Sequence, residues 1–103
     1  MTEVVRIPMY SFEYTNEFLE KHQDMITSLV KGYNFTNVGL ISKHCSSFRA
    51  EWHFNGFDTD RQISTMIRVV YDYSRKILLI DTLDNVNGAR AVNRVDEIYG
   101  VEL

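Results

Sequence analysis

The pattern of apolar and polar residues from position 61 to position 85 predicts a β-hairpin in which both faces are partly apolar. One face of its first strand carries six residues that favour β structure: Ile63, Thr65, Ile67, Val69, Tyr71 and Tyr73. The other face still carries Met66 and Val70, and the returning strand contains the aliphatic run 77–80. Strands of an ordinary surface hairpin alternate, because only one face meets the core. We therefore expect a helix of the same chain, a second copy or a partner to cover the second face.

The position of one acidic residue, Asp81, favours one register for this hairpin. With either Ser74-Arg75 as a two-residue tip or residues 73–76 as a four-residue loop, Arg68 lies opposite Asp81 as a cross-strand ion pair. A shift by one residue would place Asp81 opposite Ile67 on the core face, where an unpaired carboxylate costs several kcal/mol. The preferred register brings six residues to the second face, and we predict that they bind a partner: Met66, Arg68, Val70, Leu79, Asp81 and Leu83.

The rest of the chain predicts an α+β domain of 103 residues. Residues 4–14 alternate as a strand, and an amphipathic helix begins at Thr15 or Asn16 and ends at Lys31. A weaker strand covers residues 37–43, and a clearer one covers residues 46–55, with four residues pointing inward: Phe48, Ala50, Trp52 and Phe54. Residues 87–99 predict a second amphipathic helix, capped by Asn87. The expected order is β-α-β-β-β-β-α around a mainly antiparallel sheet, as one domain over residues 1–103.

Two arrangements of the helices are compatible with this pattern. The stripe formed by Val92, Val95 and Tyr99 on the second helix could cover the second face of the hairpin. Alternatively, both helices could share one face and leave the other for a partner.

Composition excludes several classes of protein. Hydrophobic residues make up 45% and charged residues 24% of the chain, which argues against disorder. A net charge of −3 does not suit a dedicated nucleic-acid binder. Cys45 is the only cysteine, so a disulfide-stapled fold is excluded. Without a secretory leader pattern or a run of about 20 apolar residues, the sequence predicts a cytoplasmic protein with no membrane partner.

Candidate catalytic and metal-binding residues do not form a known motif. His44, Cys45 and His53 offer nitrogen and sulfur ligands, but no fourth soft ligand follows at zinc-site spacing. Neighbours on an extended chain point in opposite directions, so His44 is not a natural base for Cys45. The acidic segment 58–60 lacks the glycine and the distal glutamate of a calcium loop, which favours a turn. We therefore predict no enzyme, no metal and no cofactor.

Function is predicted from the second face of the hairpin. An apolar patch on a small acidic domain favours a protein-binding or regulatory module, of the inhibitor or adaptor type, which pairs with another protein or with a second copy of itself as a homodimer. The alternative is a single-stranded nucleic-acid binder that uses Arg49, His53, Arg68 and Lys76 beside Tyr73.

Overall fold

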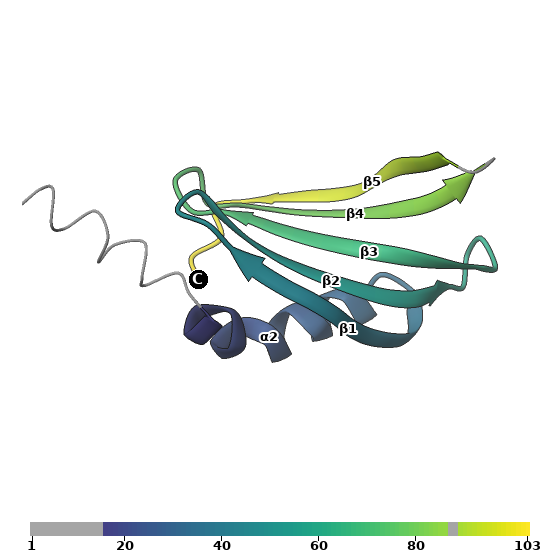
Figure 1. Cartoon of the computed structure of the whole chain (residues 1–103), viewed down its shortest axis with the longest axis horizontal. Helices are drawn as coiled ribbons and strands as arrows, with labels where there is room; N and C mark the ends of the chain where they lie inside the picture. Colours follow the sequence, from purple (N-terminus) through teal and green to yellow (C-terminus); the bar gives the residue numbers. More distant parts are fainter. Residues whose placement is uncertain (1–15, 87–88) are drawn as a thin grey trace, which may run out of the picture.

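One helix and five strands make up the part of the chain that the structure describes. The computed structural model describes residues 16–86 and 89–103. The elements, in chain order, are α2 (Asn16–Lys31), β1 (Phe35–Cys45), β2 (Arg49–Asp58), β3 (Ile63–Asp72), β4 (Ile77–Val86) and β5 (Ala89–Tyr99). All neighbouring strands are antiparallel, in the spatial order β1-β2-β3-β4-β5. Figure 1 shows this five-stranded meander with α2 alongside β1 and β2.

The α+β class and the antiparallel sheet are confirmed, but the prediction of a second helix is wrong. Residues 89–99 form β5, which pairs with β4 from Val86↔Ala89 to Ile77↔Tyr99. The apolar residues of this segment fit a helical stripe and a strand almost equally well, because Val92, Val95 and Ile98 are β-branched. Pairing with the exposed edge of β4 settles the choice. The predicted strand at residues 4–14 lies outside the described residues.

The predicted register of the hairpin is confirmed. Arg68 lies opposite Asp81, and the pairs on either side follow the same register. The β2–β3 and β3–β4 turns share one construction. Asp58 and Asp72 each accept backbone N–H bonds from the second and third residues that follow. Gln62 and Lys76 then close the turns with positive φ angles of 59° and 56°. The acidic segment at 58–60 is therefore a hairpin turn, as expected.

The core lies between α2 and the inner face of the sheet. Leu19, Ile26 and Val30 of α2 are fully buried. Trp52 on β2 is also fully buried, and its indole Nε1 donates a hydrogen bond to the backbone oxygen of Leu19 at 3.1 Å. Burying an indole requires a partner for its N–H, so this bond fixes the height of the helix over the sheet.

The last residues of the chain cover the inner face where the helix does not reach. Val101 and Leu103 pack against the core cluster. The Tyr71 hydroxyl donates to the Val101 oxygen at 2.6 Å, and the Val101 amide donates to the Lys76 oxygen at 2.9 Å. Elsewhere on the inner face, Tyr33 donates to Asp96 on β5 at 2.6 Å. The segment after β5 thus completes the inner layer that α2 leaves open.

An ionic network closes the inner face near the β2–β3 turn. Arg61 lies between Asp58 and Asp84, at 2.7 Å from the first carboxylate and 2.6 Å from the second. Thr65 and Asn93 also donate to Asp84. The Arg61 bonds, together with those from Thr65 and Asn93, outweigh burial and hold the pKa of Asp84 below its ordinary value of 3.8. The ionised form of Asp84 is therefore the one that stabilises the fold.

Trp52 provides a test of the helix–sheet contact. Replacing Trp52 with Phe removes the bond to Leu19 and leaves a cavity, so the free energy of unfolding should fall by about 2–3 kcal/mol. The matched control is Phe48, which was expected to point inward but is 78% exposed in the β1–β2 turn. Phe48→Leu should change the free energy by no more than about 0.5 kcal/mol. Urea denaturation followed by circular dichroism measures both, and equal losses would contradict this packing.

Asp84 provides a test of the ionic network. Because the pKa of Asp84 is lower in the folded protein, its ionised side chain contributes fully to stability above its ordinary pKa of 3.8. This contribution is lost as the pH falls through the pKa of the folded state. Asp84→Asn should therefore reduce stability at neutral pH and flatten the loss of stability between about pH 5 and pH 2. Thermal unfolding across this range measures the effect, with Asp24→Asn on the exposed side of α2 as the control. An unchanged pH profile in Asp84→Asn would be inconsistent with the network.

Candidate interaction surface

The sheet face opposite α2 is a grid of side chains whose rows run across the strands. Paired residues of an antiparallel sheet project to the same side. The central row from β2 to β5 contains His53, Arg68, Asp81 and Arg94. The row on one side contains Glu51, Val70, Leu79 and Glu97, and the row on the other side contains Asn55, Met66, Leu83 and Val92. We call these twelve residues the open face.

Asp81 anchors the central row. Its side chain is only 2% exposed, and Arg68 contacts it with two nitrogens, at 3.1 Å from Nε to Oδ1 and 2.6 Å from Nη2 to Oδ2. A bulge in β5 at Val95 lets Arg94 lie opposite Asp81 on the same side. The buried carboxylate thus bonds the Arg68 guanidinium, whereas the Arg94 guanidinium on the other neighbouring strand contacts Glu97.

All six predicted partner-binding residues lie on the open face, but they are not equally accessible. Val70 and Asp81 are buried beneath their neighbours. The other four, Met66, Arg68, Leu79 and Leu83, are half-buried. Val70 is therefore a structural residue of the face, and a substitution there would test packing more than binding. Whether the six bind a partner stays a prediction.

The most exposed apolar residues on this side of the sheet are ones that the sequence pattern had assigned to a helix. Val92 is 57% exposed and Tyr99 is 68% exposed, and both lie on β5, where Leu83 and Ile77 face them across the ladder. The dipeptide Asn87-Gly88 is the signal that could have placed them, because Asn-Gly between two β-favouring segments is typical of a hairpin.

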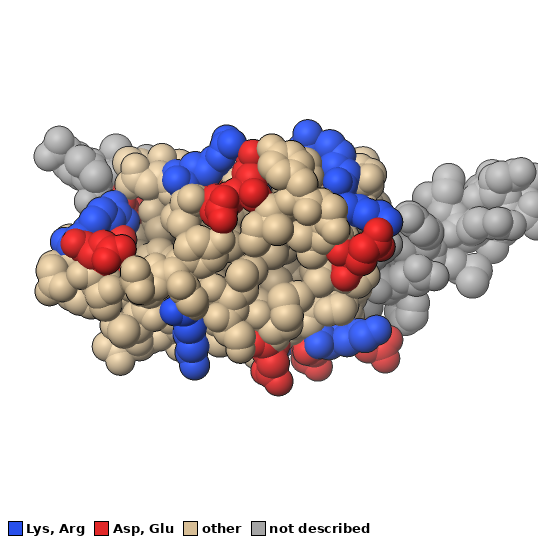
Figure 2. Space-filling model, turned by 180° about the vertical axis from the view of Figure 1, so that it is seen from behind, with Lys and Arg blue, Asp and Glu red and all other residues tan. Residues whose placement is uncertain are grey.

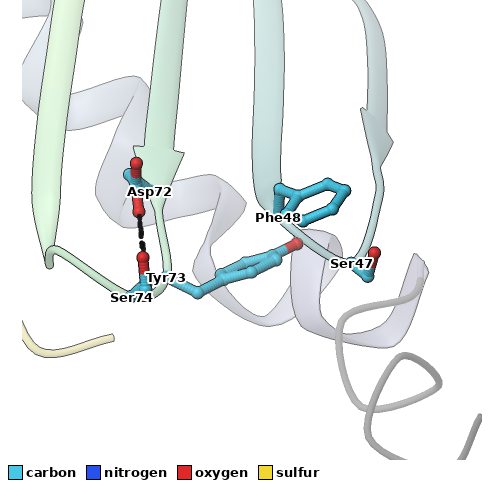
Figure 3. Close-up of a pocket in the computed structure, with 5 residues that line it drawn as sticks. All are labelled: Ser47, Phe48, Asp72, Tyr73 and Ser74. Atoms are coloured by element: carbon cyan, nitrogen blue, oxygen red, sulfur yellow. Dashed lines mark hydrogen bonds between the residues drawn. The ribbon is translucent and has the colours of Figure 1, made fainter. Parts of the chain in front are cut away.

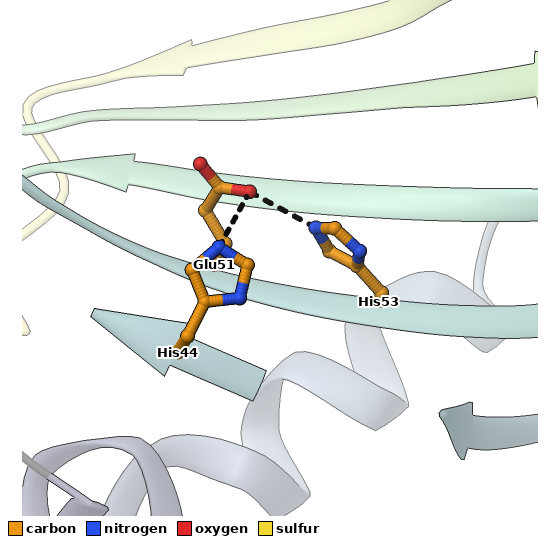
Figure 4. A group of neighbouring side chains, drawn as sticks. All are labelled: His44, Glu51 and His53. Atoms are coloured by element: carbon orange, nitrogen blue, oxygen red, sulfur yellow. Dashed lines mark hydrogen bonds and ion pairs between the residues drawn. The ribbon is translucent and has the colours of Figure 1, made fainter. Parts of the chain in front are cut away.

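A second polar group lies at the β1–β2 side of the same sheet face. His44 on β1 pairs with Glu51 on β2, and His53 follows two residues later on the same side (Figure 4). Glu51 Oε1 lies 3.4 Å from His44 Nε2 and 2.9 Å from His53 Nε2. Its other oxygen contacts Arg49 Nε at 2.8 Å. Burial raises the pKa of the Glu51 carboxyl, but the bond from His53 and the charges of Arg49, His44 and His53 outweigh it, so the pKa is lowered.

The basic residues considered for nucleic-acid binding are each paired with a carboxylate. Arg49 and His53 contact Glu51, Arg68 contacts Asp81, and Lys76 contacts Glu102. Phosphate binding requires cations whose charge is available. In the view of Figure 2, basic and acidic side chains lie next to one another and no area of one sign dominates.

A small pocket of about 160 Å³ lies between the β1–β2 and β3–β4 turns (Figure 3). It is lined by Ser47, Phe48, Asp72, Tyr73 and Ser74. The Asp72 carboxylate accepts hydrogen bonds from the Ser74 hydroxyl and the Arg75 backbone N–H, each at 3.0 Å, so it is already engaged within the turn. We therefore interpret the pocket as a hollow between two turns and not as a ligand site.

Cys45, the other residue weighed for catalysis, lies on the inner side of the sheet. It packs against the core cluster, and burial raises the pKa of its thiol. A raised pKa favours the protonated thiol over the nucleophilic thiolate. The position of Cys45 is thus that of a packing residue.

The chain matches no protein-family model, no curated protein and no solved structure. Within residues 16–86 and 89–103, no helix has the length and apolar character needed to cross a bilayer.

Arg68 provides a test of the central row. Arg68→Ala leaves the buried Asp81 carboxylate without its bidentate partner, so the free energy of unfolding should fall by about 3–5 kcal/mol. Arg94→Ala, which removes an exposed guanidinium from the same row, should cost no more than about 1 kcal/mol. Adding Asp81→Leu to Arg68→Ala should recover most of the loss, because the unpaired charge is removed with it. Chemical denaturation of the four proteins measures this, and an Arg68→Ala cost equal to that of Arg94→Ala would refute it.

Proposed function

We propose that this protein is a small binding module that acts through the open face of its sheet, and that the occupant of this face is a second copy of the chain. The observation that carries the proposal is the cluster of exposed apolar side chains on β5. Val92, Val95 and Tyr99 are all exposed. Val92 continues directly into Leu83 and Met66 across the ladder. Apolar surface that is continuous over several strands is typical of an interface.

The charges of the open face favour a copy of itself as the partner. In a two-fold interface each surface group meets the same surface of the other copy, so the face must complement itself. Arg94 and Glu97 lie side by side on β5, with Arg94 Nη2 2.8 Å from Glu97 Oε1. A face that carries both positive and negative side chains can bind a second copy of itself while each charge keeps an opposite charge nearby. A strongly basic or strongly acidic partner would gain little electrostatic attraction from it.

The dimensions of the face suit a reversible dimer. Four strands spaced about 4.8 Å apart and about six residues of each strand cover roughly 300–400 Å² of sheet. Two such faces give an interface below the usual range for tight complexes of about 1,200–2,000 Å². We therefore expect a monomer–dimer equilibrium and a mass that depends on concentration.

Single-stranded nucleic-acid binding remains the alternative function. It requires Arg49, Arg68 and Lys76 to leave their carboxylate partners, which costs favourable contacts before any phosphate is bound. Strong, salt-sensitive binding to an oligonucleotide with no self-association would favour this alternative over the proposal.

Sedimentation of the full chain over about 1–100 μM tests the proposed function. The apparent mass should rise from one chain toward two. Val92→Asp places a carboxylate in the apolar centre and should shift the dissociation constant by at least about tenfold, since burying an unpaired charge costs more than about 1.4 kcal/mol. Val92 is exposed, so the variant should keep the unfolding midpoint of the parent.

The matched control is Met25→Asp, which changes an exposed apolar residue of α2 on the opposite layer. It should self-associate like the parent protein. A mass of one chain at every concentration, or equal effects of the two substitutions, would overturn the proposal.

A further inference from the structure

Three nitrogen and oxygen donors converge on the β1–β2 side of the sheet. One ligand atom from each of His44, Glu51 and His53 lies within 4.8 Å of the other two. Figure 4 shows both imidazole rings directed at the same carboxylate, one from β1 and one from β2. Cross-strand pairing brings His44 to Glu51, and strand alternation brings Glu51 and His53 to the same side. The arrangement therefore follows from the two strands themselves and does not depend on a loop.

We propose that His44, Glu51 and His53 form a binding site for a divalent transition-metal ion of the zinc class. The ligand atoms are Nε2 of each histidine and Oε1 of the glutamate. Two histidines and one carboxylate are a known three-ligand set for zinc and for iron(II), and they leave further positions for water or another ligand. The imidazole nitrogens favour these ions over calcium and magnesium, which prefer oxygen ligands.

The distances from Glu51 to the two histidines are close to those between ligands of one ion, and the two imidazoles offer nitrogens within 4.8 Å of each other. Ligand atoms at about 2.0–2.1 Å from a tetrahedral zinc ion lie about 3.3 Å from one another. The two distances to Glu51 Oε1, 3.4 Å from His44 and 2.9 Å from His53, fall on either side of this value. Binding requires each Nε2 to present its lone pair, so the ring proton must lie on Nδ1. Small side-chain rotations then open the space for the ion.

Neighbouring residues hold the carboxylate in place. Glu51 is almost fully buried, and Arg49 Nε contacts its Oε2 at 2.8 Å, which leaves Oε1 facing the histidines. Outer contacts of this kind orient ligands in metal sites. The guanidinium charges of Arg49 and Arg68 oppose a cation, and Glu51 and Asp81 balance them. The nitrogen ligands must therefore supply the selectivity.

Cys45 is excluded from this ligand set, although it follows His44 in the sequence. His44 projects from the outer side of β1 beside Glu51, whereas Cys45 packs against the core cluster on the inner side. The expectation of no metal rested on His44, Cys45 and His53 taken together. It left out Glu51, which the β1–β2 register supplies in place of the thiol.

Calorimetric titration of the tag-free full chain with Zn²⁺ tests the proposal. The parent protein should bind zinc, and Co²⁺ should give the visible absorption of a cobalt ion with nitrogen ligands. His44→Ala, His53→Ala and Glu51→Gln should each weaken zinc binding by at least about tenfold, because losing even an outer contact of a metal site costs this much. His22→Ala, which changes the remaining histidine of the chain, on α2, should bind zinc like the parent.

Thermal unfolding with Zn²⁺ and with EDTA provides the second readout. Zinc should raise the unfolding midpoint of the parent and of His22→Ala, and should not raise that of His44→Ala. His44 is exposed, so this variant keeps the test valid even if Glu51→Gln does not fold. No zinc binding by the parent, equal loss in His22→Ala, or a Ca²⁺ affinity equal to that for zinc would overturn the proposal. Val92→Asp should retain the site, so this outcome is independent of self-association.

Discussion

Asp81 is a carboxylate with almost no contact with water, and the arrangement of the sheet depends on how its charge is balanced. Arg68 satisfies both of its oxygens from the neighbouring strand. Only one register of β3 and β4 allows this contact, and that register decides which side chains meet α2 and which form the open face. A buried ion pair adds little net stability, because desolvation offsets most of the attraction. Its contribution here is to specify one pairing among several that would bury similar apolar area.

The two sides of the sheet differ in function: one packs the core and the other faces solvent. The inner side is mainly apolar, with an ionic network near the β2–β3 turn, and it is closed by α2 and by the residues after β5. The open face combines buried charges with exposed apolar groups toward β5, and on the same side of the sheet His44 on β1 joins Glu51 and His53. The exposed apolar residues on which the proposed self-association rests lie toward β5, and the proposed metal ligands lie toward β1.

The sequence alone was enough to predict the pairing of β3 with β4. It was not enough where the same residue pattern fits both a helix and a strand. The hairpin register could be predicted because Arg68 and Asp81 leave a single low-cost alignment, and the bounds of α2 because its cap and apolar stripe agree. The segment 89–99 could not be assigned, since its β-branched residues satisfy helical spacing while the edge of β4 offers pairing that no local pattern reveals. Phe48 was placed inward because alternation was extended past the start of β2 into the turn. The histidine cluster was missed because His44 lies beyond the end of the strand predicted at 37–43, so nothing local aligned it with Glu51.

The bulge at Val95 determines where β5 can tolerate a change in length. On one side of it Asp96 pairs with Ile80, and on the other Arg94 pairs with Asp81, so one extra residue separates two stretches of regular alternation. Deleting Val95 would therefore leave a regular ladder, and all the remaining side chains of the strand would stay on their present side of the sheet. Loss of a residue elsewhere in β5 would turn one stretch over and exchange its inner and outer side chains, unless the bulge were given up to compensate. The edge strand thus holds one spare residue, which lets a deletion in its length be absorbed without moving Ile98 out of the core.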